Sequence, residues 1–305
     1  MKRELGQYYT VGNPFSLKPF KDWAQKANLK KEIVLEPFAG ANNIISLLKD
    51  LDYASHFKSY DIVPNNDAVI CRDSLKDFPK GHAVCITNPP WLAKNSATRR
   101  GLSFPNPLYD DIYKYALSKC LDNCRFVAAI IPESFITAGI FHNRLNCVIS
   151  LAYEMFNDTD APSCLALFSP INTDDFEVYR NNQKLGMFYQ MQRYLPQMRS
   201  KYEVSFNRQD GNLGLYAIDD TNSASIRFCD VDELKGYEVS QSCRSITKIK
   251  VERKVNVKTL NWKLNDFRGL TQDIFLTAFK GLRKDGMYRR RLDFGLARRI
   301  INAQQ

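Results

Sequence analysis

Short apolar segments alternate with amphipathic ones through the first 170 residues of the chain. Strand-like segments lie at residues 33–37, 57–62, 69–74, 82–87, 126–132, 148–152 and 164–168. Helical spacing of apolar residues marks 109–121, and 44–51 follows Asn43, a suitable N-cap for a helix. Continuous apolar strands are typical of a sheet covered on both faces. The pattern therefore predicts an α/β fold with a doubly wound, mostly parallel sheet.

The pattern changes after about residue 172. Residues 172–175 (Asn-Thr-Asp-Asp) have the composition of a linker, and short aromatic-rich pieces, polar loops and basic segments follow. Residues 283–291 form a basic, turn-like run, and 292–301 have the spacing of a closing helix. We therefore predict a catalytic domain over residues 1–172 and a second, smaller region over residues 173–305.

Composition limits the classes of protein to which this chain can belong. Hydrophobic residues make up 44% and charged residues 25% of the 305 positions, which is ordinary for a globular protein. No apolar run reaches the roughly 18 residues of a membrane helix, and the N-terminus has no apolar signal-peptide core. The eight cysteines form no Cys-x-x-Cys pair, and none of the three histidines stands at zinc-ligand spacing from a cysteine. We therefore expect reduced thiols in a cytoplasmic protein, with no disulfides, no metal site and no membrane contact.

The positive charge is concentrated at one end of the chain. The net charge is +10, and residues 240–305 carry 16 Lys and Arg against 5 Asp and Glu, a net of +11. Residues 171–239 carry 8 against 11, and residues 1–170 carry 19 against 17. Such a patch is typical of nucleic-acid binders, although a solvated basic surface has the same composition.

Asn88-Pro89-Pro90-Trp91 is the most informative motif. It follows the strand at 82–87, and open α/β sheets place their chemistry at the carboxyl ends of strands. Two prolines fix the backbone and remove two N–H donors, which leaves local carbonyls as acceptors beside the Asn88 side-chain oxygen. Two acceptors next to an aromatic plane suit a flat ring that carries an exocyclic NH2 group.

A second cluster of residues suits a nucleotide-like cofactor. The small-residue loop at 38–43 (Phe-Ala-Gly-Ala-Asn-Asn) joins a strand to a helix, which lets a ligand approach the backbone and the helix N-terminus. It lacks the full Gly-x-Gly-x-x-Gly of nicotinamide dinucleotide sites. Asp61 ends the next strand, where an acidic residue commonly takes ribose hydroxyls, and Asp73-Ser74 ends the third. Each Asp alone is more often a cap or turn residue.

Together these motifs resemble those of S-adenosylmethionine-dependent adenine-N6 DNA methyltransferases. Residues 5–10 (Leu-Gly-Gln-Tyr-Tyr-Thr) resemble the short motif that precedes the sheet in that family, and the order of motifs is similar to its gamma type. The chain departs from the pattern at Asn42, where the family has a second Gly, and at Trp91, where it usually has Tyr or Phe. Asn is the residue that best replaces Gly at positive φ.

The resemblance implies a Rossmann-like methyltransferase sheet and S-adenosyl-L-methionine as the cofactor. It assigns cofactor binding to Tyr9, Thr10, Glu36, Phe38, Ala39, Gly40, Asn43, Asp61, Ile62, Asp73, Ser74 and Asn88. It assigns catalysis to Asn88, Pro89, Pro90 and Trp91, with Phe156 as a second aromatic wall, although Phe156 is equally consistent with a core residue. The target adenine would be flipped out of the duplex to reach this site.

The resemblance also implies double-stranded DNA as the partner, a C-terminal target recognition domain and a role as a modification enzyme. A separate cognate restriction endonuclease would then exist. We expect the protein to be a monomer. Basic residues that could contact phosphates are Lys94, Arg99, Arg100, Arg253, Lys254, Lys258, Arg283, Lys284, Arg289, Arg290 and Arg291. The residues at 94–100 are equally consistent with an ordinary polar loop.

Three other functions remain open at this point. The enzyme could methylate another amine or amide, such as an RNA adenine, cytosine N4 or a protein glutamine. The fold could serve a DNA-binding protein without catalysis, although the intact motif at residues 88–91 argues against it. A nuclease is least favoured, because Glu252-x-Lys254 has no convincing upstream Asp in a strand.

Overall fold

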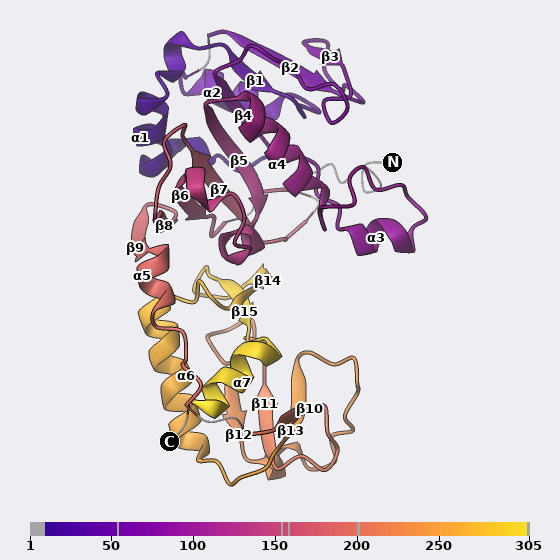
Figure 1. Cartoon of the computed structure of the whole chain (residues 1–305), viewed down its shortest axis with the longest axis vertical. Helices are drawn as coiled ribbons and strands as arrows, with labels where there is room; N and C mark the ends of the chain where they lie inside the picture. The colour runs from indigo at the N-terminus through magenta and orange to yellow at the C-terminus, as the bar shows by residue number, and fades with distance from the viewer. Residues whose placement is uncertain (1–9, 54, 154, 158, 200–201, 304–305) are drawn as a thin grey trace. The chain divides into compact units, whose positions relative to one another are not determined.

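The computed structural model describes residues 10–53, 55–153, 155–157, 159–199 and 202–303. The chain divides into two compact units, Met1–Gly186 and Met187–Gln305 (Figure 1).

The first unit is built on a nine-stranded sheet in the order β3-β2-β1-β4-β5-β7-β6-β8-β9. Adjacent strands from β3 to β5 are parallel, as are β6 and β8, while β7 is antiparallel to both β5 and β6. The predicted doubly wound, mostly parallel α/β sheet is confirmed. The strands are β1 (Val34–Glu36), β2 (Phe57–Asp61), β3 (Val69–Cys71), β4 (Val84–Thr87), β5 (Phe126–Pro132), β6 (Leu145–Ser150), β7 (Ser163–Phe168), β8 (Glu177–Arg180) and β9 (Gln183–Met187).

Four α-helices accompany this sheet among the described residues. They are α1 (Lys18–Lys26), α2 (Asn43–Asp50), α3 (Lys94–Arg99) and α4 (Ile112–Asn123). Every residue of β4 and β7 is buried, which explains their continuous apolar sequences. The Trp23 indole of α1 donates a hydrogen bond to the Phe168 carbonyl (2.9 Å), so α1 is fixed to the carboxyl end of β7. Short 3₁₀ turns lie at Pro14–Ser16, Leu29–Lys31, Glu133–Thr137 and His142–Arg144.

The strand order reverses between β1 and β4, and this fixes the place of the site. From β1 the chain moves outward to β2 and β3, then returns to pair β4 with the other side of β1. Such a switch point leaves a crevice at the carboxyl ends of the two central strands.

The division between the units falls later than the predicted boundary at 172/173. Residues 147–150 of β6 pair in parallel with 177–180 of β8, and Phe176 and Val178 are fully buried. The polar run at 172–175 is therefore a connection within the first unit. Its polar composition suggested a linker because the apolar pattern does not show that the strand after it, β8, pairs with β6.

The second unit has a four-stranded antiparallel sheet in the order β10-β13-β11-β12. These strands are β10 (Val204–Phe206), β11 (Leu213–Tyr216), β12 (Arg227–Cys229) and β13 (Ile246–Val251), and a hairpin of β14 (Thr277–Leu282) and β15 (Tyr288–Arg291) follows. Its helices are α5 (Phe188–Gln192), α6 (Val257–Thr271) and α7 (Phe294–Asn302), with a 3₁₀ turn at Val231–Leu234. The predicted closing helix is confirmed as α7, which begins after Asp293, whose side chain accepts a hydrogen bond from the Leu296 N–H.

A buried ion network lies in this unit beneath the β14–β15 hairpin. Asp219 is fully buried and accepts hydrogen bonds from the guanidinium groups of Arg268 (2.9 and 3.0 Å) and Arg283 (2.9 Å). It also accepts from the backbone N–H groups of Ser225 and Ile226. Part of the positive charge in the C-terminal sequence is therefore internal.

Candidate active site at the carboxyl ends of β1 to β4

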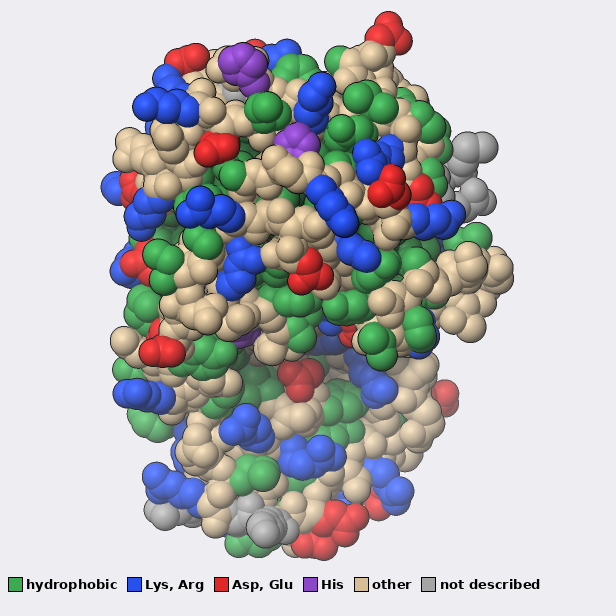
Figure 2. Space-filling model, turned by 45° about the horizontal axis from the view of Figure 1, so that its top comes forward, with side chains coloured by type: hydrophobic (Ala, Val, Ile, Leu, Met, Phe, Trp, Pro, Cys, Tyr) green, Lys and Arg blue, Asp and Glu red, His purple; other side chains and the backbone are tan. Residues whose placement is uncertain are grey.

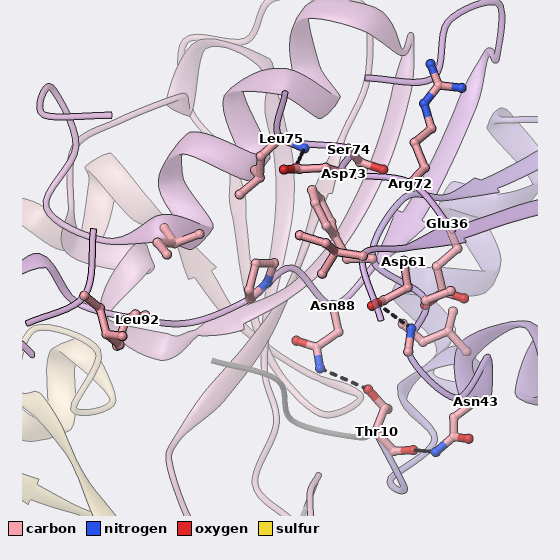
Figure 3. Close-up of a pocket in the computed structure, with 18 of the residues that line it drawn as sticks. Thr10, Glu36, Asn43, Asp61, Arg72, Asp73, Ser74, Leu75, Asn88 and Leu92 are labelled. Atoms are coloured by element: carbon pink, nitrogen blue, oxygen red, sulfur yellow. Dashed lines mark hydrogen bonds between the residues drawn. The ribbon is translucent and has the colours of Figure 1, made fainter. Parts of the chain in front are cut away.

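One cavity collects residues from the ends of four neighbouring strands (Figure 3). Eleven of the twelve residues predicted to bind a cofactor line it, and Tyr9, the twelfth, lies outside the described residues. The eleven are Thr10, Glu36, Phe38, Ala39, Gly40, Asn43, Asp61, Ile62, Asp73, Ser74 and Asn88. All of them except Thr10 lie at or after the carboxyl ends of parallel strands, which share one edge of the sheet. Thr10 precedes the sheet and forms a bridge with Phe156.

The loop after β1 adopts the backbone conformation that its small residues permit. Gly40 has a φ of 51° and Asn42 a φ of 65°, so Asn42 occupies the left-handed region expected where the family has Gly. The Ser59 hydroxyl donates a hydrogen bond to the Asn42 side-chain oxygen (2.7 Å), which fixes that side chain. The helix begins one residue earlier than expected: Asn42 is the N-cap residue and Asn43 the first residue of α2, so the prediction of Asn43 as the cap is wrong.

Asp61 connects the end of β2 to this loop. Its two carboxylate oxygens accept hydrogen bonds from the backbone N–H groups of Gly40 (2.8 Å) and Val63 (2.8 Å). Burial raises the pKa of Asp61 above its usual value, and the N–H groups of Val63, Gly40 and Ile62 partly offset this. A carboxylate has about four acceptor directions, so Asp61 can both hold the loop and contact a ligand hydroxyl.

Glu36 ends β1 at the floor of the cavity. Burial raises its pKa well above the usual value, the nearby Asp61 carboxylate raises it further, and a hydrogen bond from the Ile45 N–H lowers it in part. Within the described part of the chain, its Oε2 atom is buried without a hydrogen-bond partner. A buried oxygen of this kind is costly unless a ligand satisfies it.

The opposite end of the cavity is apolar. Ile62, Leu75, Leu92, Leu102 and Ile112 line it. Beside them, the Ser74 hydroxyl is buried with no hydrogen-bond partner among the described residues. An apolar slot with one polar group suits a flat heterocycle such as adenine.

The apolar part of the cavity depends on residues 93–111, which were not predicted to belong to the cofactor site. Residues 93 and 111 form an antiparallel bridge, and the Asp111 carboxylate accepts hydrogen bonds from the N–H groups of Leu92 (3.1 Å) and Tyr113 (3.3 Å). The intervening segment thereby folds back and brings Leu102 and Ser103 to the cavity. Burial raises the pKa of Asp111 to about 6, partly offset by those two N–H groups. No motif marks these residues, because the contact joins positions 19 residues apart.

Asn88 enters the cavity from the end of β4. Its side-chain nitrogen donates a hydrogen bond to the Thr10 hydroxyl (3.4 Å), and Asn43 donates to the Thr10 carbonyl (3.0 Å). Figure 3 shows the amide nitrogen of Asn88 turned toward Thr10 and the amide oxygen on the other side. Pro90 also lines the cavity. The two-acceptor motif and the small-residue loop thus share one space.

Two aromatic side chains lie beside Asn88. Trp91 and Phe156 are in edge-to-face contact, with ring centroids 5.1 Å apart and an interplanar angle of 88°. Their exposed fractions are 8% and 3%, and neither they nor Pro89 line the cavity. Phe156 forms a bridge with Thr10, so the backbone places it next to the Asn88 amide. The two rings that were expected to enclose a base are therefore adjacent to each other.

The basic residues after the motif lie on a helix rather than in a loop. Lys94 and Arg99 belong to α3, and Arg100 follows it. Lys94 is half-buried and donates to the Pro107 carbonyl (3.2 Å), while Arg99 and Arg100 are exposed.

Two of the C-terminal basic residues that were predicted to contact phosphates are buried. Arg283 is 7% and Arg290 is 2% exposed, because β15 alternates its side chains and turns Arg290 inward while Arg283 pairs with Asp219. Arg289 and Arg291 are half-buried, Arg253 is half-buried over the Tyr202 ring, and Lys254, Lys258 and Lys284 are exposed. On the face drawn in Figure 2, Lys and Arg mix with Asp, Glu and hydrophobic side chains. Net charge alone does not single out a binding surface there.

Among the described residues, no three His, Cys, Asp or Glu side chains are grouped so that they could hold a metal ion. In that same part of the chain, every helix falls short of the length and apolar character that a membrane span requires.

Comparison with known proteins gave matches in structure only. No protein-family model and no curated protein matches the chain. A candidate class I S-adenosylmethionine-dependent methyltransferase from Listeria monocytogenes is 11% identical with a TM-score of 0.38, covering 56% of this chain and 68% of its own. A methyltransferase subunit of a type I restriction-modification system from Streptococcus thermophilus is 16% identical with a TM-score of 0.38, over 59% of this chain and 50% of its own. The M protein of the type I restriction enzyme EcoKI is 12% identical with a TM-score of 0.38, over 88% and 72%.

This chain thus spans about half of the Streptococcus protein. At these scores the likenesses do not bear on activity or substrate. Function is therefore inferred from the site alone.

Proposed function

We propose that the chain is an S-adenosylmethionine-dependent methyltransferase that acts on the N6 amine of adenine in double-stranded DNA. One observation carries this proposal: Asn88, at the end of β4, lines the same cavity as Glu36, Gly40 and Asp61. An acceptor for an exocyclic amine and a site for a nucleoside-like cofactor are therefore within reach of each other.

The cavity fits S-adenosyl-L-methionine at both of its ends. Glu36 and Asp61 would accept the ribose hydroxyls, and the Glu36 Oε2 atom is buried with no partner in the described part of the chain. Ser74 and the apolar side chains of Ile62, Leu75 and Leu102 would hold the adenine. When bound, the cofactor supplies an electrophilic methyl group on its sulfonium.

Asn88 would prepare the target nitrogen for attack. The lone pair of an exocyclic adenine amine is delocalised into the ring, so the amine is a poor nucleophile. Hydrogen bonds from its N–H groups to the Asn88 oxygen and the Pro89 carbonyl favour a pyramidal nitrogen with an available lone pair. Thr10 accepts from the Asn88 nitrogen, which orients the amide oxygen toward the substrate.

The transfer itself requires no strong base. The N6 lone pair would form the new N–C bond while the S–C bond breaks with its electrons left on sulfur, and the nitrogen would then lose a proton to water. Positioning and local electrostatics would supply most of the rate enhancement. Trp91 and Phe156 would separate to stack on the flipped base, which contributes roughly 1–3 kcal/mol by analogy with single-strand stacking.

We propose DNA contact through the exposed or half-buried basic residues of the predicted set, and leave out Arg283 and Arg290 because they are buried. The remaining residues are Lys94, Arg99, Arg100, Arg253, Lys254, Lys258, Lys284, Arg289 and Arg291. A modification role beside a separate endonuclease belongs to the same proposal.

The deciding experiment supplies the purified chain with labelled S-adenosylmethionine and unmethylated genomic DNA, followed by nucleoside analysis. We expect the label in N6-methyladenine. Label in N4-methylcytosine, RNA or protein would replace adenine-N6 with another amine or amide acceptor. Binding of the cofactor with no transfer to any of them would indicate a non-catalytic protein on this fold.

A further inference from the structure

A column of four planar groups lies on the second unit. The Phe206 and Phe294 rings are stacked almost in parallel, with centroids 4.2 Å apart and an interplanar angle of 5°. The Arg244 guanidinium carbon lies 5.0 Å from the centroid of Phe294, and that of Arg298 lies 5.4 Å from the centroid of Phe206. Two cations therefore flank a pair of stacked rings.

The column belongs to a longer strip where α7 runs beside β10. Residues 294, 298 and 302 are one helical turn apart, so they share one face of α7. Phe294 stacks on Phe206, Arg298 donates to the Val204 carbonyl (3.1 Å), and the Asn302 side chain accepts from the Tyr202 N–H (2.8 Å).

A third cation extends the strip at that end. The Arg253 guanidinium carbon lies 4.4 Å from the centroid of the Tyr202 ring, and one of its N–H groups donates to the Tyr202 hydroxyl (3.4 Å). The arginine strip, as defined here, consists of Arg244, Phe294, Phe206, Arg298, Tyr202 and Arg253. It follows β10, the edge strand of its sheet.

The charge balance of the strip differs from that of Arg208 and Arg227, two other exposed arginines of the second unit. Within the described residues, neither Arg244 nor Arg298 pairs with a carboxylate, and Arg244 makes no hydrogen bond. Arg208 pairs with Asp210 (3.1 Å), and Arg227 pairs with Glu233 (2.7 Å). Of the acidic residues next to the strip, Asp293 caps α7 and Glu252 accepts from the Glu203 N–H.

A guanidinium that stacks on an aromatic ring keeps its N–H groups in its own plane, where they point away from its centre. Little side-chain entropy is lost when such a group meets a phosphate, because its orientation is already fixed. Guanidinium groups also bind phosphate oxygens bidentately. Two or three of them in a row, on the charge-rich part of the chain, suit a row of phosphates.

We propose that the arginine strip binds the phosphate backbone of double-stranded DNA, with Arg244 and Arg298 each contacting a phosphate. This inference rests on the proposed function, because it names the face of the second unit that meets the substrate. Arg283 and Arg290, which the sequence predicted to contact phosphates, are buried and support the fold instead. The arginine strip replaces them as a source of electrostatic attraction to DNA.

The test is a salt titration of DNA affinity with the full chain. Each phosphate contact makes the slope of the logarithm of the DNA-binding constant against log salt more negative by about 0.9. Arg244→Gln and Arg298→Gln should therefore each reduce the steepness of this slope by about 0.9, and the double variant by about twice that. Arg244→Gln carries the test alone if Arg298→Gln lowers the unfolding midpoint, because Arg298 also holds the Val204 carbonyl.

The second unit offers a matched control. Arg227 lies 4.7 Å over the Tyr216 ring but is paired with Glu233. Arg227→Gln removes one positive charge and one arginine–aromatic contact, as Arg244→Gln does. It should leave the salt dependence of DNA affinity unchanged. An equal loss in Arg227→Gln would overturn the proposal, since general charge would then account for it.

The outcome also separates this inference from the proposed function. If the wild-type chain methylates DNA adenine and Arg244→Gln keeps its slope and affinity, the arginine strip is not the binding face and the function stands. If the wild-type chain binds S-adenosylmethionine but shows no salt-dependent DNA affinity, the proposed DNA substrate fails, and the strip fails with it.

Discussion

At the scale of single residues, Asn88 is the group on which the proposed chemistry depends. Asn88→Ala removes the acceptor for the target amine while leaving Glu36, Asp61 and Ser74 in the cavity. We expect the rate of methyl transfer to fall by about 10²–10³ or more, by analogy with the loss of one preorganised group at a reacting centre. Cofactor affinity, measured by calorimetry, should change little. Retained turnover would remove Asn88 from the mechanism.

Thr10 should act through Asn88 rather than on the substrate. Thr10→Val deletes the hydroxyl that accepts from the Asn88 amide but keeps the carbonyl that accepts from Asn43. A neutral hydrogen bond is worth about 0.5–1.5 kcal/mol, so kcat should fall by roughly 2- to 12-fold. Steady-state kinetics should show this fall in kcat with KM for the cofactor nearly unchanged. Thr10→Ser, which retains a hydroxyl, should restore the rate.

Glu36 links cofactor binding to stability. Its raised pKa means that its contribution to stability is present below the unfolded-state value near 4.3 and is lost as pH rises through the folded-state pKa. Glu36→Gln stays neutral, so the cofactor-free variant should lose less stability than the wild type as pH is raised above about 4.3. Thermal unfolding across that range measures the difference. The variant should also bind the cofactor more weakly, since an acceptor for ribose hydroxyls is lost.

At the scale of elements, the Asp219 network holds the β14–β15 hairpin to the rest of its unit. Arg268, Arg283 and the backbone N–H of Arg290 all meet this one carboxylate. Burial acts to raise the pKa of Asp219, but Arg268 and the N–H groups of Ile226 and Ser225 outweigh it, so the pKa is lowered. The stability that it contributes is therefore present above the unfolded-state value near 3.9 and is lost as pH falls through the folded-state pKa.

Asp219→Ala should destabilise the chain by at most about 3–5 kcal/mol. It removes the buried carboxylate that Arg268 and Arg283 share, and leaves Arg268 with Asp273 and Arg283 with Asp285. Urea unfolding measures this change. Asp220→Ala is the control: its carboxylate is exposed and accepts hydrogen bonds from the N–H groups of Asn222 and Ser223. An equal effect of the two substitutions would mean that the buried network is not what holds the hairpin.

The sequence predicts the elements of the first unit well and those of the second unit poorly, for a physical reason. Strands such as β5 and β7 are buried on both faces, so their sequences are continuously apolar and unambiguous. Most of the site residues lie at or just after the ends of parallel strands, so chain connectivity fixes their positions at one edge of the sheet. Leu92, Leu102 and Ile112 were missed because a hydrogen bond to Asp111 brings them together.

The same reasoning explains the basic run at 283–291. Its charge suggests a surface, but Arg283 and Arg290 are buried because Asp219 lies beneath them, and no local pattern shows a contact between residues 64 positions apart. The stacked rings of the arginine strip are also far apart in sequence, at 206 and 294. Composition therefore shows that the C-terminal sequence is basic, and only the fold shows which of its basic side chains are buried and which are exposed.

At the scale of the whole molecule, the two units differ in charge. Residues 187–305 carry 22 Lys and Arg against 13 Asp and Glu, a net of +9, which leaves 21 against 20 for residues 1–186. If the second unit binds DNA and the first binds the cofactor, the two affinities should respond differently to salt. Release of condensed counterions makes DNA binding fall steeply with ionic strength, whereas a buried small-molecule site is screened little.

We expect DNA affinity to fall by at least about 10-fold between roughly 50 and 200 mM salt, which is the loss expected from the phosphate contacts of Arg244 and Arg298 alone. Over the same range, cofactor affinity should change by less than about 2-fold, because the residues around Glu36 and Asp61 are shielded from the solvent. Fluorescence anisotropy with a labelled duplex and calorimetry with the cofactor measure the two quantities on the same protein. Equal sensitivity of both affinities would contradict the division of roles between the units.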